Sequence, residues 1–130
     1  MIRISNDNFI INEVPHESFY SKENDFILEV EDVNCIKHKI TFYKYSVLKI
    51  MFEDVVDLSR YFSNNGQYEF CLNYILEIEN SSLIAQCKKQ AFKNSTSFGN
   101  RIKYHHYVLF VGDYVIEIVA HSYIIKKSEE

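Results

Sequence analysis

The stretch that decides the fold is "YHHYVLFVGDYVIEIVAH", residues 104–121, which holds two mainly apolar runs on either side of Gly112-Asp113. Glycine at the first central position is typical of a type II′ turn, so the stretch predicts an antiparallel hairpin with a two-residue loop. Such a loop fixes the register and places Leu109 opposite Ile116. The face that this pair occupies is expected to belong to the core.

The opposite face of this hairpin collects reactive side chains. His106 has Glu117 and His121 as diagonal neighbours, whereas His105 falls on the core face. A trio of this kind suits a general base oriented by a carboxylate, or a divalent metal held by two histidines and a glutamate. It equally suits side chains that satisfy one another on a sheet face. Diagonal neighbours lie roughly 7 to 8 Å apart, which is wide for a metal shell, so we expect the structural role.

Motifs of nucleophilic or nucleotide chemistry are missing elsewhere in the sequence. There is no GxSxG, P-loop, HExxH or glycine-rich dinucleotide loop, and the chain has only 3 glycines. We therefore expect no enzyme, no metal and no cofactor. The alternative is a small hydrolase or isomerase that uses His106, Glu117 and His121.

Residues 25–43 also alternate between apolar and polar side chains, and they predict a second hairpin. A three-residue loop at 32–34 pairs Leu28 with His38 and Glu29 with Lys37, so that like faces meet.

Three further elements complete the expected fold. Apolar residues three and four apart predict a long amphipathic helix over 46–62, and alternation predicts a strand over 67–79. Helical spacing after a serine that could act as a cap predicts a short helix over 81–92. The sum is an α+β fold, an antiparallel sheet of about five strands with one long and one short helix packed on a face.

Composition and length indicate one domain over residues 1–130. The chain is 47% hydrophobic and 25% charged, and it carries 10 Tyr and 10 Phe. No apolar run is long enough to span a membrane, and residues 1–8 lack the apolar segment of a signal peptide. Three cysteines without CxxC spacing indicate reduced thiols. A cytoplasmic protein without membrane contact is expected.

Charge is unevenly distributed, which suggests a partner. The formal net charge is −4, and residues 1–34 hold eight acidic side chains. An arranged negative surface speeds association with a basic protein, and aromatic residues anchor interfaces. The carboxylates expected to make contact are Glu29, Glu31, Asp32, Glu53, Asp54 and Asp57. The aromatic anchors expected beside them are Tyr20, Tyr43 and Tyr61.

A basic stretch between residues 80 and 112 raises nucleic-acid binding as a third possible function. It holds five basic side chains and no acidic one, interleaved with aromatic residues, as on nucleic-acid-binding surfaces. Its basic residues are Lys88, Lys89, Lys93, Arg101 and Lys103. Because dedicated nucleic-acid binders are usually strongly basic and this chain is acidic, direct binding is not expected, and a regulatory domain of this kind stays an alternative.

Two segments, "ENSSLIAQCKKQAF" and "HYVLFVGDYVIEIVAHSYII", resemble the C-terminal half of small cytoplasmic immunity proteins of bacterial polymorphic toxins, including those of contact-dependent growth inhibition systems. The resemblance covers about 50 residues, and the matching positions are those of scaffold residues. It implies a non-enzymatic inhibitor that binds one cognate toxin domain, often a nuclease, and blocks its active site or substrate path. The oligomeric state stays open.

Overall fold

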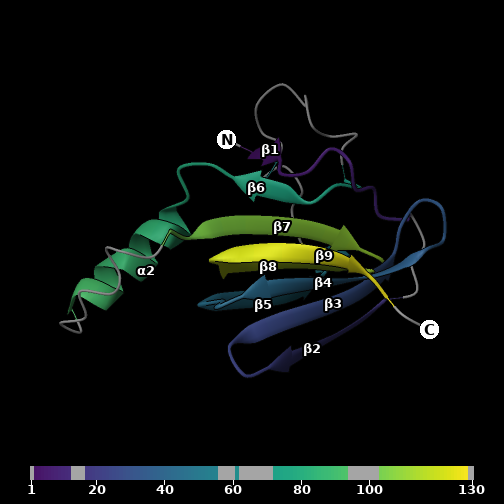
Figure 1. Cartoon of the computed structure of the whole chain (residues 1–130). Coiled ribbons are helices and arrows are strands. Elements are labelled where there is room, and N and C mark those ends of the chain that lie inside the picture. The colour runs from purple at the N-terminus through teal and green to yellow at the C-terminus, as the bar shows by residue number, and fades with distance from the viewer. Residues whose placement is uncertain (1, 13–16, 56–60, 62–71, 94–102, 129–130) are drawn as a thin grey trace.

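The structure, a computed structural model, describes residues 2–12, 17–55, 61, 72–93 and 103–128. Within these residues it contains nine strands in two antiparallel sheets, one α-helix and one 3₁₀ turn (Figure 1). The five-stranded sheet has the order β1 (Ile2–Ile4), β6 (Leu76–Ile78), β7 (His105–Val111), β8 (Tyr114–Ala120) and β5 (Val47–Phe52). The four-stranded sheet has the order β2 (Ser18–Lys22), β3 (Asp25–Glu31), β4 (Lys37–Tyr43) and β9 (Ser122–Lys127).

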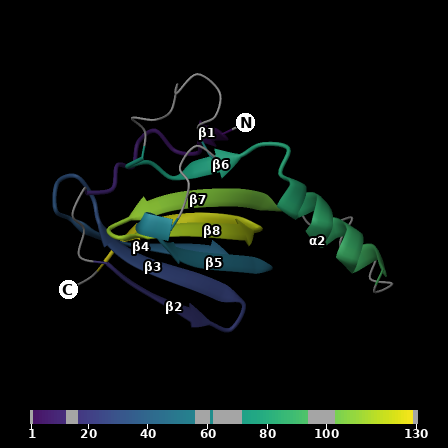
Figure 2. The ribbon, with the colours of Figure 1, turned by 180° about the vertical axis from the view of Figure 1, so that it is seen from behind.

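The α+β prediction is therefore wrong, because the described chain is mostly β and carries a single helix, α2 (Ser82–Lys93). That helix confirms the short helix expected over 81–92. It extends away from the sheets at the end where β7 begins (Figures 1 and 2). The helix covers neither sheet face in these views, so two sheets packed on each other replace the single sheet with helices on one face.

The long helix predicted over 46–62 is wrong over its first half. Residues 47–52 form strand β5, which pairs with β8 from Val47↔Val119 to Phe52↔Tyr114, and the 3₁₀ turn η1 (Glu53–Val55) follows. Residues 56–60 and 62 lie outside the described residues. Both faces of β5 are mainly apolar, so strand alternation is hidden in the sequence, and pairing with β8 decides the conformation instead of helix-like spacing.

The strand predicted over 67–79 is confirmed as a strand over 76–78, where β6 lies. Residues 72–74 form a turn and a bend, and residues 67–71 lie outside the described residues. The predicted sharing of one face is confirmed for Tyr74, Leu76 and Ile78, which pack in the same apolar cluster.

The C-terminal hairpin has the predicted register. Leu109 pairs with Ile116 and His105 with Ala120, and Gly112 takes the left-handed φ of 58° that the turn requires. In the β3–β4 hairpin the predicted register is wrong by two residues, because Leu28 pairs with Ile40. The loop there spans residues 32–36, and the two-residue shift leaves every side chain on its expected face.

The longer β3–β4 loop has a local cause. The Asp32 carboxylate accepts hydrogen bonds from the amides of Asn34 (2.8 Å) and Ile36 (3.0 Å), and Cys35 adopts a left-handed φ of 62°. Side-chain capping of this kind stabilises a wider turn than three residues provide. The alternation of apolar and polar residues in the sequence does not by itself indicate this wider turn.

The main core lies between the two sheets. The inward faces of β3 and β4 meet those of β7 and β8, and their largest fully buried side chains include Phe26, Phe42, Leu109, Ile116 and Ile118. A second, smaller cluster lies on the outer face of the five-stranded sheet, where Tyr61 packs with Leu76, Val108 and Val115. His106 and Glu117 lie on this second face, so the five-stranded sheet is covered on both sides around them.

Gly112 provides a direct test of the hairpin turn. A Cβ atom added there would lie 2.8 Å from Glu17 Oε1, on a backbone whose φ is unfavourable for side chains. Because the Glu17 side chain can move, backbone strain dominates, and Gly112→Ala is expected to lower the free energy of unfolding by about 1 to 2 kcal/mol. Urea unfolding measures it. Asp113→Ala, at the exposed neighbouring position, should change stability by less than about 0.5 kcal/mol, and equal losses in the two variants would contradict the assigned turn.

Candidate functional site

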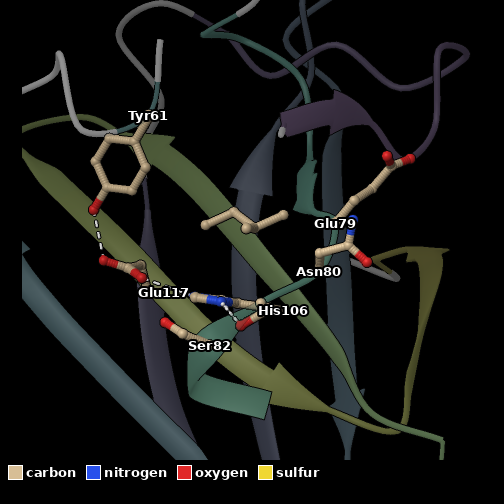
Figure 3. A pocket seen from close by; sticks show the side chains of 8 residues that line it. Tyr61, Glu79, Asn80, Ser82, His106 and Glu117 are labelled. Carbon is tan, nitrogen blue, oxygen red and sulfur yellow. Dashed lines mark hydrogen bonds and ion pairs between the residues drawn. The ribbon is translucent and has the colours of Figure 1, made fainter. Parts of the chain in front are cut away.

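Four side chains form a chain of short hydrogen bonds on the outer face of the five-stranded sheet. Tyr61 donates its hydroxyl to Glu117 Oε2 (2.6 Å), and His106 Nε2 contacts Glu117 Oε1 (2.8 Å). The other ring nitrogen, Nδ1, lies 2.7 Å from the hydroxyl of Ser81. The Tyr61–Glu117 bond and the bond that joins His106 to Ser81 are drawn in Figure 3. His106 is 5% exposed and Glu117 is 3% exposed, so the bonds lie away from bulk water.

Local structure explains how these residues meet. The β7–β8 register places Val108 opposite Glu117, so His106 is the diagonal neighbour of Glu117 on the same face. Ser81 arrives from the β6–α2 junction, where Asn80 has a left-handed φ of 53°. The Ser81 hydroxyl also accepts the amide N–H of Ile84 (3.2 Å) and thereby caps α2.

The protonation states within the network follow from this geometry. Burial acts to raise the pKa of Glu117, but the hydrogen bonds from His106 and Tyr61 outweigh burial and lower the pKa from 4.5 to about 2. Glu117 is therefore a carboxylate and only accepts hydrogen bonds. His106 Nε2 must carry the proton, and in the neutral ring Nδ1 then accepts the proton of the Ser81 hydroxyl.

A pocket of about 260 Å³ opens beside this network. Its walls combine the network with the β6–α2 junction, and they are formed by Tyr61, Ile78, Glu79, Asn80, Ser81, Ser82, His106 and Glu117. The serine and histidine at the end of the hydrogen-bonded chain therefore border a space that a small molecule could enter.

His121 does not belong to this group, contrary to the predicted trio. It is exposed beyond the end of β8, and its Nδ1 donates to the carbonyl of Lys103 (3.1 Å). The predicted group is thus correct for His106 and Glu117. Ser81 and Tyr61 were missed as its members. The sequence predicts a serine cap at the start of α2 without singling out Ser81, and no sequence signal joins Tyr61 to a strand 56 residues away.

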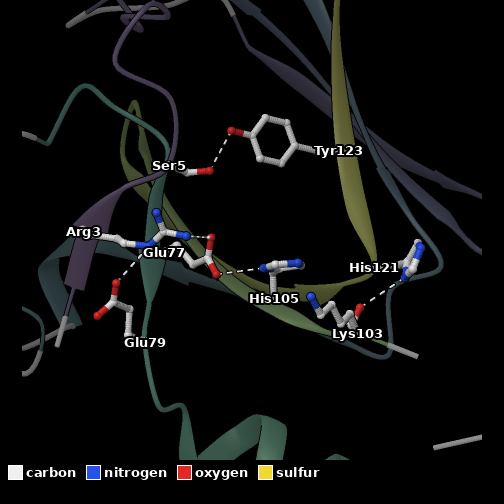
Figure 4. A network of polar contacts seen from close by, with 8 residues as sticks. All are labelled: Arg3, Ser5, Glu77, Glu79, Lys103, His105, His121 and Tyr123. Carbon is white, nitrogen blue, oxygen red and sulfur yellow. Dashed lines mark hydrogen bonds and ion pairs between the residues drawn. The ribbon is translucent and has the colours of Figure 1, made fainter. Parts of the chain in front are cut away.

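A second polar network lies on the inner face of β6 and β7, around His105 (Figure 4). Glu77 contacts His105 Nδ1 (2.8 Å) and Arg3 (3.1 Å), and Arg3 also reaches Glu79 (3.1 Å). The His105 ring stacks on Tyr107, whose pKa is raised by burial and by the nearby Glu77 charge. These ion pairs join the edge strand β1 to β6 and β7.

The carboxylates predicted to contact a partner do not form one surface in the structure. Glu29 and Glu31 lie on the outward face of β3, opposite Lys39 and Lys37. Glu29 lies 3.8 Å from the Lys39 ammonium group. The negative charge on this face is compensated in register.

Asp32 serves the β3–β4 loop. Besides the two backbone amides, its carboxylate accepts His38 Nε2 (2.8 Å). Burial acts to raise the pKa of Asp32, but these hydrogen bonds outweigh it and hold the pKa below the usual value.

Glu53 and Asp54 lie elsewhere, on η1 at the end of the edge strand β5. Both are exposed, and they lie between the two most exposed apolar side chains of the described chain, Phe52 (60%) and Val55 (78%). The amide of Glu53 donates to the carbonyl of Asp113 (2.8 Å), which brings the exposed β7–β8 turn alongside. We call these residues the acidic corner: Phe52, Glu53, Asp54, Val55 and Asp113. No ion pair joins its carboxylates to another described residue.

The remaining predicted contacts lie apart from the acidic corner. Tyr20 (42% exposed) and Tyr43 face outward on the four-stranded sheet, whereas Tyr61 is buried against Glu117. Asp57 lies outside the described residues.

The basic stretch is described only in part. Lys88, Lys89 and Lys103 are exposed. Arg101 and the side chain of Lys93 lie outside the description. Cys35 and Cys87 are free thiols, and Cys71 also falls outside the described residues.

Comparisons with protein-family models, with curated proteins and with solved structures find no match to this chain. In the described part of the chain no helix has the length and apolar character needed to cross a membrane. Nor do three or more His, Cys, Asp or Glu side chains gather there in an arrangement that could hold a metal ion.

Proposed function

We propose that this protein inhibits a toxin domain in the bacterial cytoplasm by binding to it, without chemical modification of the toxin, and that the acidic corner is its contact surface. The observation that carries the proposal is the exposure of Phe52 and Val55 beside three carboxylates that form no ion pair with another described residue. Large apolar side chains exposed next to each other are typical of protein interfaces. The resemblance to immunity proteins, stated above, supports the identity of the partner.

The chemistry of the acidic corner suits a basic partner such as a nuclease. Surfaces that bind phosphate are rich in Lys and Arg, and carboxylates compete for these side chains through charge-assisted hydrogen bonds. Glu53, Asp54 and Asp113 have no described cation to neutralise them, unlike Glu29 and Glu31. An aromatic side chain at the centre of such a patch supplies the anchor that charged residues alone lack.

Charge reversal tests the electrostatic part of this proposal. The variant Glu53→Lys/Asp54→Lys should associate with the toxin domain roughly ten times more slowly than the wild type at low salt, and its association should depend less on salt. Stopped-flow or surface plasmon resonance measures both.

The matched control is Glu29→Lys/Glu31→Lys, which makes the same charge change on the four-stranded sheet. It should associate at close to the wild-type rate. If the control slows association as much as the corner variant does, net charge alone is responsible and the acidic corner is not the contact surface.

The hydrolase alternative loses His121 but retains His106 and Glu117. A hydrolase that uses Ser81 in place of His121 is favoured by the hydrogen bond of Ser81 to His106. For nucleic-acid binding, the exposed lysines Lys88, Lys89 and Lys103 are compatible with contact to phosphate, and no further described feature favours it.

A further inference from the structure

We propose that Ser81 is a nucleophile, activated by His106 and Glu117, that accepts the acyl group of small uncharged esters bound in the neighbouring pocket. This activity is independent of toxin binding. His106 lies six residue steps along β7 from Gly112 in the turn beside the acidic corner, a distance of roughly 20 Å. The two surfaces can therefore be tested one at a time.

The geometry has the order of groups that activates a serine. A carboxylate, Glu117, holds the proton of His106 on Nε2 (2.8 Å), and this leaves the Nδ1 lone pair to accept from Ser81 (2.7 Å). The ring is turned relative to the usual arrangement of serine hydrolases, in which the serine contacts Nε2 and the carboxylate contacts Nδ1. Either imidazole nitrogen can act as the base, so the sequence of proton transfers is the same.

Further contacts hold this arrangement in place. Tyr61 donates to the second oxygen of Glu117, which fixes the carboxylate plane. The amide of Ile84 donates to Ser81, which orients the hydroxyl at the first turn of α2. A buried and fully bonded group of this kind is held rigidly, as a catalytic group must be. Helix capping alone explains the bond to Ile84, but it does not require the bond to His106.

The reaction follows from these contacts. The Ser81 hydroxyl gives its proton to His106 Nδ1 while its oxygen attacks the ester carbonyl carbon. The tetrahedral intermediate collapses, the C–O bond to the alcohol breaks, and His106 returns the proton to the departing alkoxide. Water then attacks the acyl-serine, its proton passes to Nδ1, and the Ser81 oxygen leaves and regains that proton as the acid is released.

The pocket limits the substrate class. Its volume of about 260 Å³ suits a small acyl ester. Its described lining contains Glu79 and Glu117 and neither Lys nor Arg, so an anionic substrate would be repelled. Short-chain esters without charge are therefore the expected ligands.

Two probes test this on the whole protein. Diisopropyl fluorophosphate should form an adduct at Ser81, as a P–O bond replaces the P–F bond, and peptide mass spectrometry locates the adduct. Hydrolysis of 4-nitrophenyl acetate should show a burst followed by slower turnover. His106→Asn should slow labelling about 100-fold, whereas His121→Asn, on the exposed histidine, should label at the wild-type rate.

Ser81→Ala removes the nucleophile but also the cap of α2, so Ser81→Gly is the second variant, because glycine is tolerated at the N-cap. Neither variant should carry the adduct or show the burst. The proposal is overturned if the wild type is not labelled at Ser81, if label appears equally on Ser82, or if His106→Asn reacts as fast as the wild type. Unchanged toxin binding by Ser81→Gly would separate this activity from the inhibitor function.

Discussion

Replacing Phe42 by alanine is expected to lower the free energy of unfolding by about 3 to 5 kcal/mol. Phe42 is fully buried between the sheets, and its ring lies within 5.6 Å of Tyr107 and 5.5 Å of Tyr123, centroid to centroid. Truncation removes apolar contact and leaves a cavity that two facing sheets cannot close easily. Urea unfolding followed by fluorescence or circular dichroism measures the loss.

The control for this prediction lies next to Phe42 on the same strand. Tyr43 faces outward, so Tyr43→Ala should cost less than about 1 kcal/mol. A double-mutant cycle of Phe42→Leu and Tyr107→Leu should also give a coupling of about 0.5 to 1.5 kcal/mol, because these rings meet across the two sheets. A coupling near zero would contradict the packing of one sheet on the other.

The second large effect is expected at Glu117. Alanine at this position should lower the free energy of unfolding by about 3 to 5 kcal/mol, because it removes the buried carboxylate that accepts from the His106 N–H and from the Tyr61 hydroxyl. Glutamine restores one acceptor and should cost less. Glu79→Ala, which removes only the partly exposed partner of Arg3, should cost below about 1 kcal/mol and serves as the control.

The same carboxylate makes stability depend on pH in the acid range. The pKa of Glu117 is lowered in the folded protein from 4.5 to about 2, so the folded state binds this proton less readily than the unfolded chain does. The stabilisation is fully present above pH 4.5 and is lost as pH falls toward 2, by at most roughly 3 kcal/mol. Glu117→Gln should flatten this part of the pH profile in urea titrations. An equally steep profile in that variant would show that other carboxylates cause the acid sensitivity.

Strand conformation and register are predicted correctly from the sequence where one local signal determines them. Gly112 fixes a two-residue turn, and the whole β7–β8 register, with the placement of His106 and Glu117 on one face, follows from it. Residues 47–52 are the opposite case, because Lys49 is the one charged residue in a strand whose faces are otherwise apolar. Pairing with β8, a contact across about 70 residues of sequence, decides their conformation.

The candidate site was predictable only in the part that lies within one hairpin. Tyr61 and Ser81 reach His106 and Glu117 from other segments, through contacts that depend on how the fold closes around the outer face of the sheet. The acidic residues show the same limit. Their number suggested a partner, but Glu29 and Glu31 face lysines in register, whereas the carboxylates around Phe52 form no ion pair with another described residue.

Growth rescue tests toxin neutralisation most directly. A toxin domain that the wild-type protein binds is expressed in bacteria together with the wild-type protein, with Phe52→Ala/Glu53→Lys/Asp54→Lys, or with Ser81→Gly, and colony counts are compared at equal protein levels. We predict that the wild type and Ser81→Gly restore growth and that the acidic-corner variant does not. Rescue by the corner variant equal to that of the wild type, or no rescue by the wild type, would contradict inhibition through the acidic corner.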